Sequence, residues 1–337
     1  MNKSQSVFTI AEVAQAHEGS LGMAHAYIDA LAKRNVDAVK FQIHLAYAES
    51  SIYEPFRKKF SYQDKTRYDY WERMSFSLDQ WLELKQHCDE SEIEFMVSVF
   101  SNTAVDWAEK IGVKRYKIGS GEVNNMLLLE RISQTKKPVI LSSGMSSLEE
   151  LDQAVHFLKS KNIDVSLLQC TTSYPTRPEQ YGFNLISQFK ERYGIKVGFS
   201  DHSAKVSTGI AAVALGADIL EFHVAFSEEQ FGPDTSSSLI LNQVEELMNG
   251  IRDVKSAIEN PVNKNDIDEF EGLKSIFEKS LAVNKDLSRG HILGFKDLEA
   301  KKPKNKGIDP KRYNEIIGKK LKTDKKAWSF LNEDDIE

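Results

Sequence analysis

Residues 138–144 read Pro-Val-Ile-Leu-Ser-Ser-Gly, a short apolar run that ends in two hydroxyls and a glycine. Apolar residues at consecutive positions are typical of a strand that is buried on both faces of a parallel sheet. Seven further runs rich in Val, Ile and Phe have this pattern, and most alternate with amphipathic stretches. The eight expected strands cover residues 7–12, 36–42, 94–100, 116–120, 138–143, 165–171, 196–201 and 219–225. Eight strand-then-helix units in roughly 260 residues predict an α/β fold of the (β/α)8 TIM-barrel type.

The pattern changes after Gly250. Residues 259–272, ENPVNKNDIDEFEG, are polar and indicate a linker, and from Lys279 onward short strands and turns follow one another. We therefore expect a barrel domain over residues 1–258, a linker over residues 259–278 and a small separate domain over residues 279–337.

Composition narrows the class of protein. The net charge of −6 argues against nucleic acid as the main partner. Cys88 and Cys170 are the two cysteines of the chain and provide no disulfide framework, which favours a reducing compartment. The first twelve residues lack the apolar core of a signal peptide, and no run reaches transmembrane length. These features predict a cytoplasmic globular protein without a membrane partner.

One connection is unusually long. Residues 43–78 follow the second expected strand and contain nine aromatic residues of the Phe, Tyr and Trp types. A βα-loop of this length is either functional or a packed excursion over the mouth of the barrel, and both readings stay open.

Polar groups stand at or beside the end of every expected strand. In a TIM barrel these ends meet at one mouth, where active sites lie. Lysines and hydroxyls there could surround a phosphate and a carboxylate, two histidines from neighbouring strands could bind a divalent ion, and glutamates could transfer protons. A lone lysine or histidine is more often an ion-pair member or a satisfied polar group, so the interpretation depends on eight coincident strand ends.

Seven segments in order resemble the signature segments of the sialic acid synthase family: IAEVAQAHEGS, DAVKFQ, KIGSGEVNN, PVILSSGM, LLQCTTSYP, GFSDHS and EFHVAF followed by FGPD. The segments that begin at SLAVNKDL resemble the antifreeze-like (SAF) domain that ends these enzymes. The resemblance implies condensation of phosphoenolpyruvate with N-acetylmannosamine or a related hexosamine. The products would be a nine-carbon 2-keto sugar acid and phosphate. It also implies a divalent metal, Mn²⁺ or Mg²⁺, and a homodimer that exchanges its C-terminal domains.

The same resemblance implies roles for individual residues. The metal ligands would be His202 and His223. Phosphoenolpyruvate would be bound by Lys40, Ser98, Lys117, Ser120, Ser142 and Ser200. The sugar would be bound by Gln42, Glu122, Tyr174 and Asp234, and by Lys302 of the C-terminal domain. The catalytic candidates are Glu12, Lys117 and Glu122.

Three departures from the family pattern leave the acceptor sugar open. Thr235 follows Asp234 where many members have His, Ala16-His17-Glu18 replaces Asn-His-Asn, and Lys302-Pro303-Lys304 replaces Arg-Pro-Gly. Lysine cannot reproduce the planar bidentate contact of arginine. One alternative is condensation with another aldose or with a sugar phosphate, which would need an arginine-rich second phosphate site that the strand ends lack. Another is a non-catalytic sugar-binding protein, which would not need the metal pair or the lysines.

Overall fold

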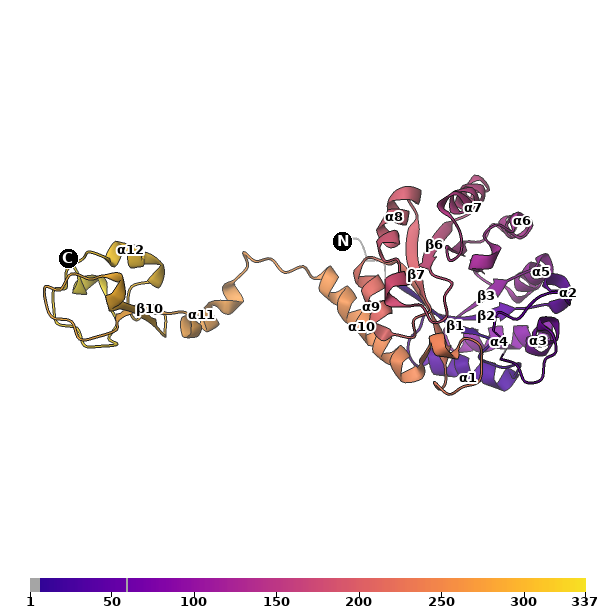
Figure 1. The fold of residues 1–337 in the computed structure, drawn as a ribbon, viewed down its shortest axis with the longest axis horizontal. Coiled ribbons are helices and arrows are strands. Elements are labelled where there is room, and N and C mark those ends of the chain that lie inside the picture. The colour runs from indigo at the N-terminus through magenta and orange to yellow at the C-terminus, as the bar shows by residue number, and fades with distance from the viewer. Residues whose placement is uncertain (1–6, 59) are drawn as a thin grey trace. The chain divides into compact units, whose positions relative to one another are not determined.

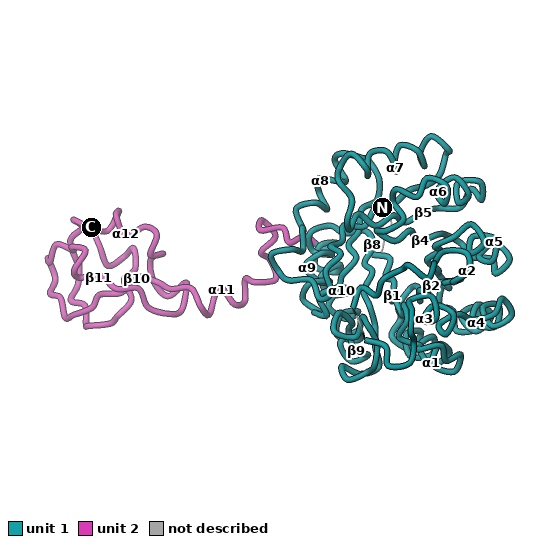
Figure 2. Tube along the Cα trace, turned by 45° about the vertical axis from the view of Figure 1, so that its right-hand side comes forward, with its two compact units in different colours: residues 1–260 teal, residues 261–337 magenta. Residues whose placement is uncertain are grey.

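The computed structural model describes residues 7–58 and 60–337 and divides into two units, residues 1–260 and 261–337 (Figure 2). Residues 1–6, which belong to the segment expected to lack a signal peptide, lie outside the described residues. Within residues 7–58 and 60–337, no helix has the length and apolar character to cross a membrane.

Eight parallel strands close into a barrel in sequence order, with β1 paired to β8 (Figure 1). They are β1 (Phe8–Ala14), β2 (Ala38–Ile43), β3 (Glu94–Val99), β4 (Tyr116–Ile118), β5 (Val139–Ser142), β6 (Val165–Cys170), β7 (Lys196–Asp201) and β8 (Ile219–Ala225). The predicted TIM barrel is confirmed, and no predicted strand end differs from the structure by more than two residues. The short strand β9 (Ser238–Ile240), which pairs with β8, was not predicted.

Helices surround the barrel (Figure 1). They are α1 (Leu21–Ala32), α4 (Leu78–Glu90), α5 (Asn102–Ile111), α6 (Met126–Ser133), α7 (Leu148–Ser160), α8 (Asn184–Tyr193), α9 (Val206–Ala214) and α10 (Leu241–Glu259). Ser20 caps α1 by accepting a hydrogen bond from the Met23 amide, as its position before an amphipathic stretch predicts. Two further helices, α2 (Ala46–Glu49) and α3 (Arg67–Met74), lie in the long connection between β2 and α4.

Apolar side chains fill part of the barrel interior. Ile10, Met96, Ile140, Leu168 and Ile219 belong to this inner cluster, and all are buried. A larger core lies between the outer faces of the strands and the helices. Because the interior is packed with apolar groups, a ligand can enter only at the carboxyl ends of the strands.

The second unit has a small core of its own. Strands β10 (Ser280–Val283) and β11 (Leu298–Lys301) pair antiparallel, and side chains such as Leu281, Leu293 and Leu331 are buried around them. The unit also contains α11 (Glu271–Phe277) and α12 (Tyr313–Ile316). It begins at Pro261, so α11 and part of the expected linker belong to it. Its assignment as an antifreeze-like domain stays a prediction.

Candidate active site

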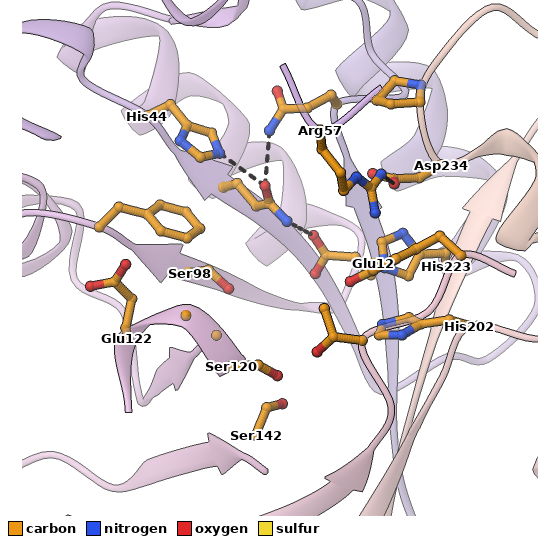
Figure 3. A pocket seen from close by; sticks show the side chains of 18 of the residues that line it. Glu12, His44, Arg57, Ser98, Ser120, Glu122, Ser142, His202, His223 and Asp234 are labelled. Carbon is orange, nitrogen blue, oxygen red and sulfur yellow. Dashed lines mark hydrogen bonds and ion pairs between the residues drawn. The ribbon is translucent and has the colours of Figure 1, made fainter. Parts of the chain in front are cut away.

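A cavity of about 400 Å³ opens at the carboxyl ends of the barrel strands (Figure 3). All of the site residues expected on the barrel line it: Glu12, Lys40, Gln42, Ser98, Lys117, Ser120, Glu122, Ser142, Tyr174, Ser200, His202, His223 and Asp234. Lys302, the remaining candidate, lies in the second unit, where its ammonium is 4.8 Å from the centre of the Phe277 ring.

Two lysines and two glutamates lie at the bottom of the cavity. We call this group the floor, and its members are Glu12, Lys40, Lys117 and Glu221. Each side chain is at most 4% exposed. Lys40 contacts Glu12, lies 3.6 Å from Glu221 and donates to Ser98 Oγ at 3.0 Å. Lys117 lies 3.3 Å from Glu221, which also accepts from Ser200 Oγ at 2.9 Å. Buried charges need such compensation, so the floor keeps two ammonium groups in a water-poor site.

The titration of the floor follows from its burial and its charges. Burial would raise the pKa of Glu221, but Lys117 and Lys40 lower this pKa to about 2, so Glu221 is the ionised partner. Burial raises the pKa of Glu12 against the opposing charge of Lys40, and burial lowers the pKa of Lys117. Glu221 was not among the site residues expected from the sequence. Its spacing of two from His223 is the available signal, because alternate strand residues point to the same face.

Small polar groups crowd the cavity beside the floor. Ser142 Oγ and Thr172 Oγ1 are buried without a hydrogen-bond partner among the residues that the structure describes. Buried polar groups are almost always satisfied, so these two hydroxyls are candidate ligand contacts. A Cβ on Gly144 would stand 2.0 Å from Ser120 Oγ and 2.4 Å from Thr172 Oγ1. A side chain at position 144 would therefore displace these hydroxyl groups.

His202 and His223 face the cavity from β7 and β8 (Figure 3), with ring centres 5.2 Å apart. His202 Nδ1 donates to the Thr171 carbonyl at 2.9 Å, which leaves its Nε2 lone pair free. Burial, and then the neighbouring His223, lowers the pKa of His202 to about 4, and burial lowers the pKa of His223. Both rings are thus neutral near pH 7, as metal ligation requires.

A divalent ion fits this pair as a site with two protein ligands. The Thr171 carbonyl orients His202 in the way that outer groups orient metal-binding imidazoles. Nowhere in residues 7–58 and 60–337 do three or more His, Cys, Asp or Glu side chains form a group that could hold a metal. The remaining ligands of an ion at this pair would therefore be water or substrate.

The long connection after β2 lines the outer side of the cavity. We call residues 44–58 and 60–71 the outer wall. His44 is stacked between Trp71 and Phe100, with ring centres 3.7 Å and 4.3 Å away. Arg57 donates to Asp234 at 2.7 Å, and its guanidinium lies 4.1 Å from the centre of the Tyr174 ring. Both readings of this loop therefore apply. Its aromatic residues pack into a small cluster of their own, and its polar residues line the cavity.

Three residues near the site have other surroundings. Burial, followed by His44, lowers the pKa of His17 to about 3, and His17 Nδ1 accepts from the Gly19 amide at 3.1 Å. Glu18 forms an ion pair with Arg73 at 3.2 Å. His17 and Glu18 stabilise the loop that follows β1 and do not line the cavity. Cys170 does line it, with its sulfur 3.2 Å from Ser120 Oγ.

Comparison with known proteins agrees with this architecture. The chain is 32% identical over 316 residues to an N,N'-diacetyllegionaminic acid synthase of Campylobacter jejuni, covering 92% of this chain and 94% of that protein. It is 31% identical over 318 residues to the N-acetylneuraminate-9-phosphate synthase of Homo sapiens, covering 93% of this chain and 88% of that protein.

A similar solved structure is the N-acetylneuraminic acid synthetase from Leptospira borgpetersenii in complex with citrate. It has a TM-score of 0.70 and 27% identity, and the match covers 80% of this chain and 92% of that chain. The model of the NeuB family matches residues 27–263, which is more than half of the sequence. The resemblance inferred from the seven ordered segments is thereby confirmed, and this chain belongs to the NeuB family.

Proposed function

We propose that this protein condenses phosphoenolpyruvate with an N-acylated hexosamine to give a nine-carbon 2-keto sugar acid and phosphate. The observation that carries the proposal is a single cavity in which two buried lysines stand beside two neutral histidines. The similarity of this chain to synthases of N,N'-diacetyllegionaminic acid and N-acetylneuraminate 9-phosphate supports the same chemistry.

Phosphoenolpyruvate binds at the floor in this proposal. Lys40 and Lys117 supply positive charge, and hydroxyls surround them, namely Ser98, Ser120, Ser142 and Ser200. Ser142 Oγ has no hydrogen-bond partner elsewhere in the described part of the chain, so a phosphate or carboxylate oxygen would satisfy it. Because these groups are fixed on strands, their main contribution is to position the enol carbon C3 against the acceptor.

His202 and His223 would hold a divalent metal, Mn²⁺ or Mg²⁺. When bound, the metal supplies Lewis-acid polarisation of the acceptor aldehyde. C3 of phosphoenolpyruvate forms the new bond to the aldehyde carbon, water adds to C2, and the C2–O bond to phosphate then breaks. Burial raises the pKa of Glu122, which makes this carboxyl a candidate donor of the proton that the aldehyde oxygen takes up. Glu12 and Lys117 are the other candidates for proton transfer.

The acceptor lies between the outer wall and the strand ends, where Gln42, Glu122, Tyr174 and Asp234 line the cavity. The alternative with a phosphorylated acceptor needs free arginines. Arg57 and Arg67 do line the cavity, but Arg57 is paired with Asp234 at 2.7 Å and Arg67 with Glu54 at 3.4 Å. A phosphorylated acceptor would have to draw either arginine away from its carboxylate partner.

The C-terminal unit completes the acceptor site of a neighbouring subunit in a domain-exchanged homodimer, with Lys302 reaching the sugar. Charge supports this part of the proposal. Residues 280–337 contain 14 Lys or Arg and 10 Asp or Glu, so their net charge is +4. Because the whole chain has a net charge of −6, the remaining residues have a net charge of −10. Opposite charges favour docking. Domain exchange is tested by mixing inactive His202→Ala chains with chains that stop after Glu271. In a heterodimer the intact barrel of the shortened chain can meet the intact C-terminal unit of the other chain, so activity should return. Proven heterodimers without activity would contradict exchange.

The function is tested by phosphate release from phosphoenolpyruvate with Mn²⁺ and a panel of hexosamines, including N-acetylmannosamine and its 6-phosphate. We expect release that stops on chelation and is absent in His202→Ala. Release from no member of the panel would contradict the function, and full release in a chelated sample would contradict the metal.

A further inference from the structure

His44 and Glu49 line the same cavity, and no role has been given to them so far. A hydrogen-bonded chain joins them to the strand-end residues, and Figure 3 shows the part of it between His44 and Glu12. Gln42 Nε2 donates to Glu12 Oε1 at 2.8 Å, so the other end of the amide, Oε1, points toward the outer wall. That oxygen accepts from Gln15 Nε2 at 2.9 Å and lies 2.9 Å from His44 Nε2. Because Gln42 Oε1 can only accept, His44 Nε2 carries a hydrogen.

This pattern fixes what Gln42 can offer to a ligand. An amide oxygen has two lone pairs, and both are used by Gln15 and His44. An amide nitrogen has two hydrogens, and one is used by Glu12. Gln42 can therefore make one further bond, as a donor from Nε2.

His44 is the group that decides the direction of this amide. Gln15 Oε1 has no hydrogen-bond partner within the described residues, so Gln15 and Gln42 could turn over together without losing their mutual bond. Turning over would place Gln42 Oε1 against Glu12 and leave the His44 Nε2 hydrogen facing an NH₂ group. Trp71 and Phe100 hold the His44 ring on both faces, so the ring cannot swing away.

Glu49 has one oxygen committed and one free. Its Oε1 contacts His44 Nδ1. Its Oε2 is buried and lacks a partner in the part of the chain that the structure describes, and the side chain is 8% exposed. The charge of Glu49 also adds to the effect of burial in raising the pKa of Glu122, so the two carboxyl groups influence the same part of the cavity. A buried carboxylate oxygen without a partner is costly, and a ligand that donates a hydrogen bond would satisfy it.

We propose that Glu49 binds a hydroxyl or amide N–H of the acceptor sugar, and that His44 is a positioning residue that orients Gln42 and Glu49 for this contact. The inference rests on the proposed condensation and adds a recognition element to its acceptor site. Glu49 Oε2 is an acceptor whichever of Glu49 and His44 carries the proton that they share, so the bound group is a hydrogen-bond donor. Glu49 thus selects among hexosamines by the presence of a hydrogen-bond donor at one carbon of the acceptor.

The positioning role of His44 is tested by steady-state kinetics of phosphate release. His44→Phe keeps an aromatic ring between Trp71 and Phe100 but removes both ring nitrogens. We expect the KM for the acceptor to rise about tenfold, the usual cost of losing an oriented hydrogen bond. The KM for phosphoenolpyruvate should not change, whereas the thermal midpoint should fall because Glu49 Oε1 loses its partner. His44→Gln, whose amide can replace the Nε2 donor, should restore part of the loss. The control is His156→Phe, at an exposed histidine of α7.

The contact of Glu49 is tested with deoxy analogues of the hexosamine that gives the fastest release. In the wild type one analogue should lose about tenfold in kcat/KM. In Glu49→Ala, or in the larger apolar Glu49→Leu if the alanine variant unfolds, that penalty should disappear while the other penalties stay. Equal penalties in wild type and variant, or an unchanged acceptor KM in His44→Phe, would overturn the inference and leave the proposed function intact. A wild type that turns over no hexosamine would overturn both.

Discussion

The floor and the outer wall of the cavity are built in different ways. The floor side chains stand on β1, β2, β4 and β8, are at most 4% exposed and compensate one another's charges. The outer wall comes from one connection between β2 and α4, and its Arg57 is 43% exposed. Strand positions are fixed by the closure of the barrel, whereas the wall depends on the contacts of a single loop. This contrast suggests that the floor carries the common chemistry and the wall carries the choice of acceptor.

The largest effect is expected from removing a floor charge. Lys117→Met should lower phosphate release by about a thousandfold, because a preorganised cation that faces the anionic substrate is lost. Binding of the acceptor should be nearly unchanged. Phosphoenolpyruvate titrations at saturating acceptor measure this effect.

The same substitution leaves Glu221 with one lysine instead of two, so folding needs a control. The double variant Lys117→Met/Glu221→Gln restores the charge balance. It should recover any lost stability without recovering activity. A selective loss of acceptor binding in Lys117→Met would contradict the assignment of this lysine to phosphoenolpyruvate.

Next in size is a pH effect on stability that arises beside the floor. Asp201 ends β7, and its carboxylate accepts from the amide and the hydroxyl of Ser203, each at 2.9 Å. Burial raises its pKa from 3.8 to about 6. A raised carboxyl pKa means that the folded state binds the proton more tightly, so the stability from this proton is complete below pH 3.8 and is lost as the pH rises through about 6.

Asp201→Asn keeps the shape and cannot ionise. Between pH 4 and pH 6.5 the free energy of unfolding of the wild type should fall by about 2 kcal/mol relative to this variant. Urea unfolding in the presence of a chelator measures the difference between the two curves. Parallel curves over this range would show that Asp201 ionises as easily in the folded as in the unfolded chain.

Gly144→Ala tests the crowding beside the floor. The added Cβ would overlap Ser120 Oγ and Thr172 Oγ1, and relieving such overpacking costs about 2 kcal/mol. We expect the KM for phosphoenolpyruvate to rise about thirtyfold, with the acceptor KM unchanged. Gly121→Ala is the matched control, because its Cβ would meet only Met145 at 3.9 Å, an ordinary contact. Equal effects of both variants would show that crowding is not the cause.

The sequence predicts the floor better than the wall for a physical reason. Strands such as residues 138–143 are visible as apolar runs, and barrel closure then brings Lys40, Lys117 and His223 to one mouth whatever the loops do. The wall depends on contacts between distant segments. Arg57 meets Asp234, 177 positions later, and nothing in the local sequence announces that pairing. His44 carried a weak signal, since positions 40, 42 and 44 alternate along β2 and its extension.

The smallest effect is expected at the outer wall, where Arg57 covers Tyr174 and pairs with Asp234. An ion pair that is 43% and 21% exposed contributes at most about 1 kcal/mol to folding, so Arg57→Gln should leave the thermal midpoint unchanged. Binding is different, because Asp234 and Tyr174 lose the group that holds them in place for the sugar. We expect the acceptor KM to rise about tenfold, with the KM for phosphoenolpyruvate unaffected. Arg177→Gln is the control, since Arg177 is 70% exposed and contacts its sequence neighbours Glu179 and Gln180. A change in the phosphoenolpyruvate KM of Arg57→Gln would break the division between floor and wall, because a loop residue would then act on the common chemistry.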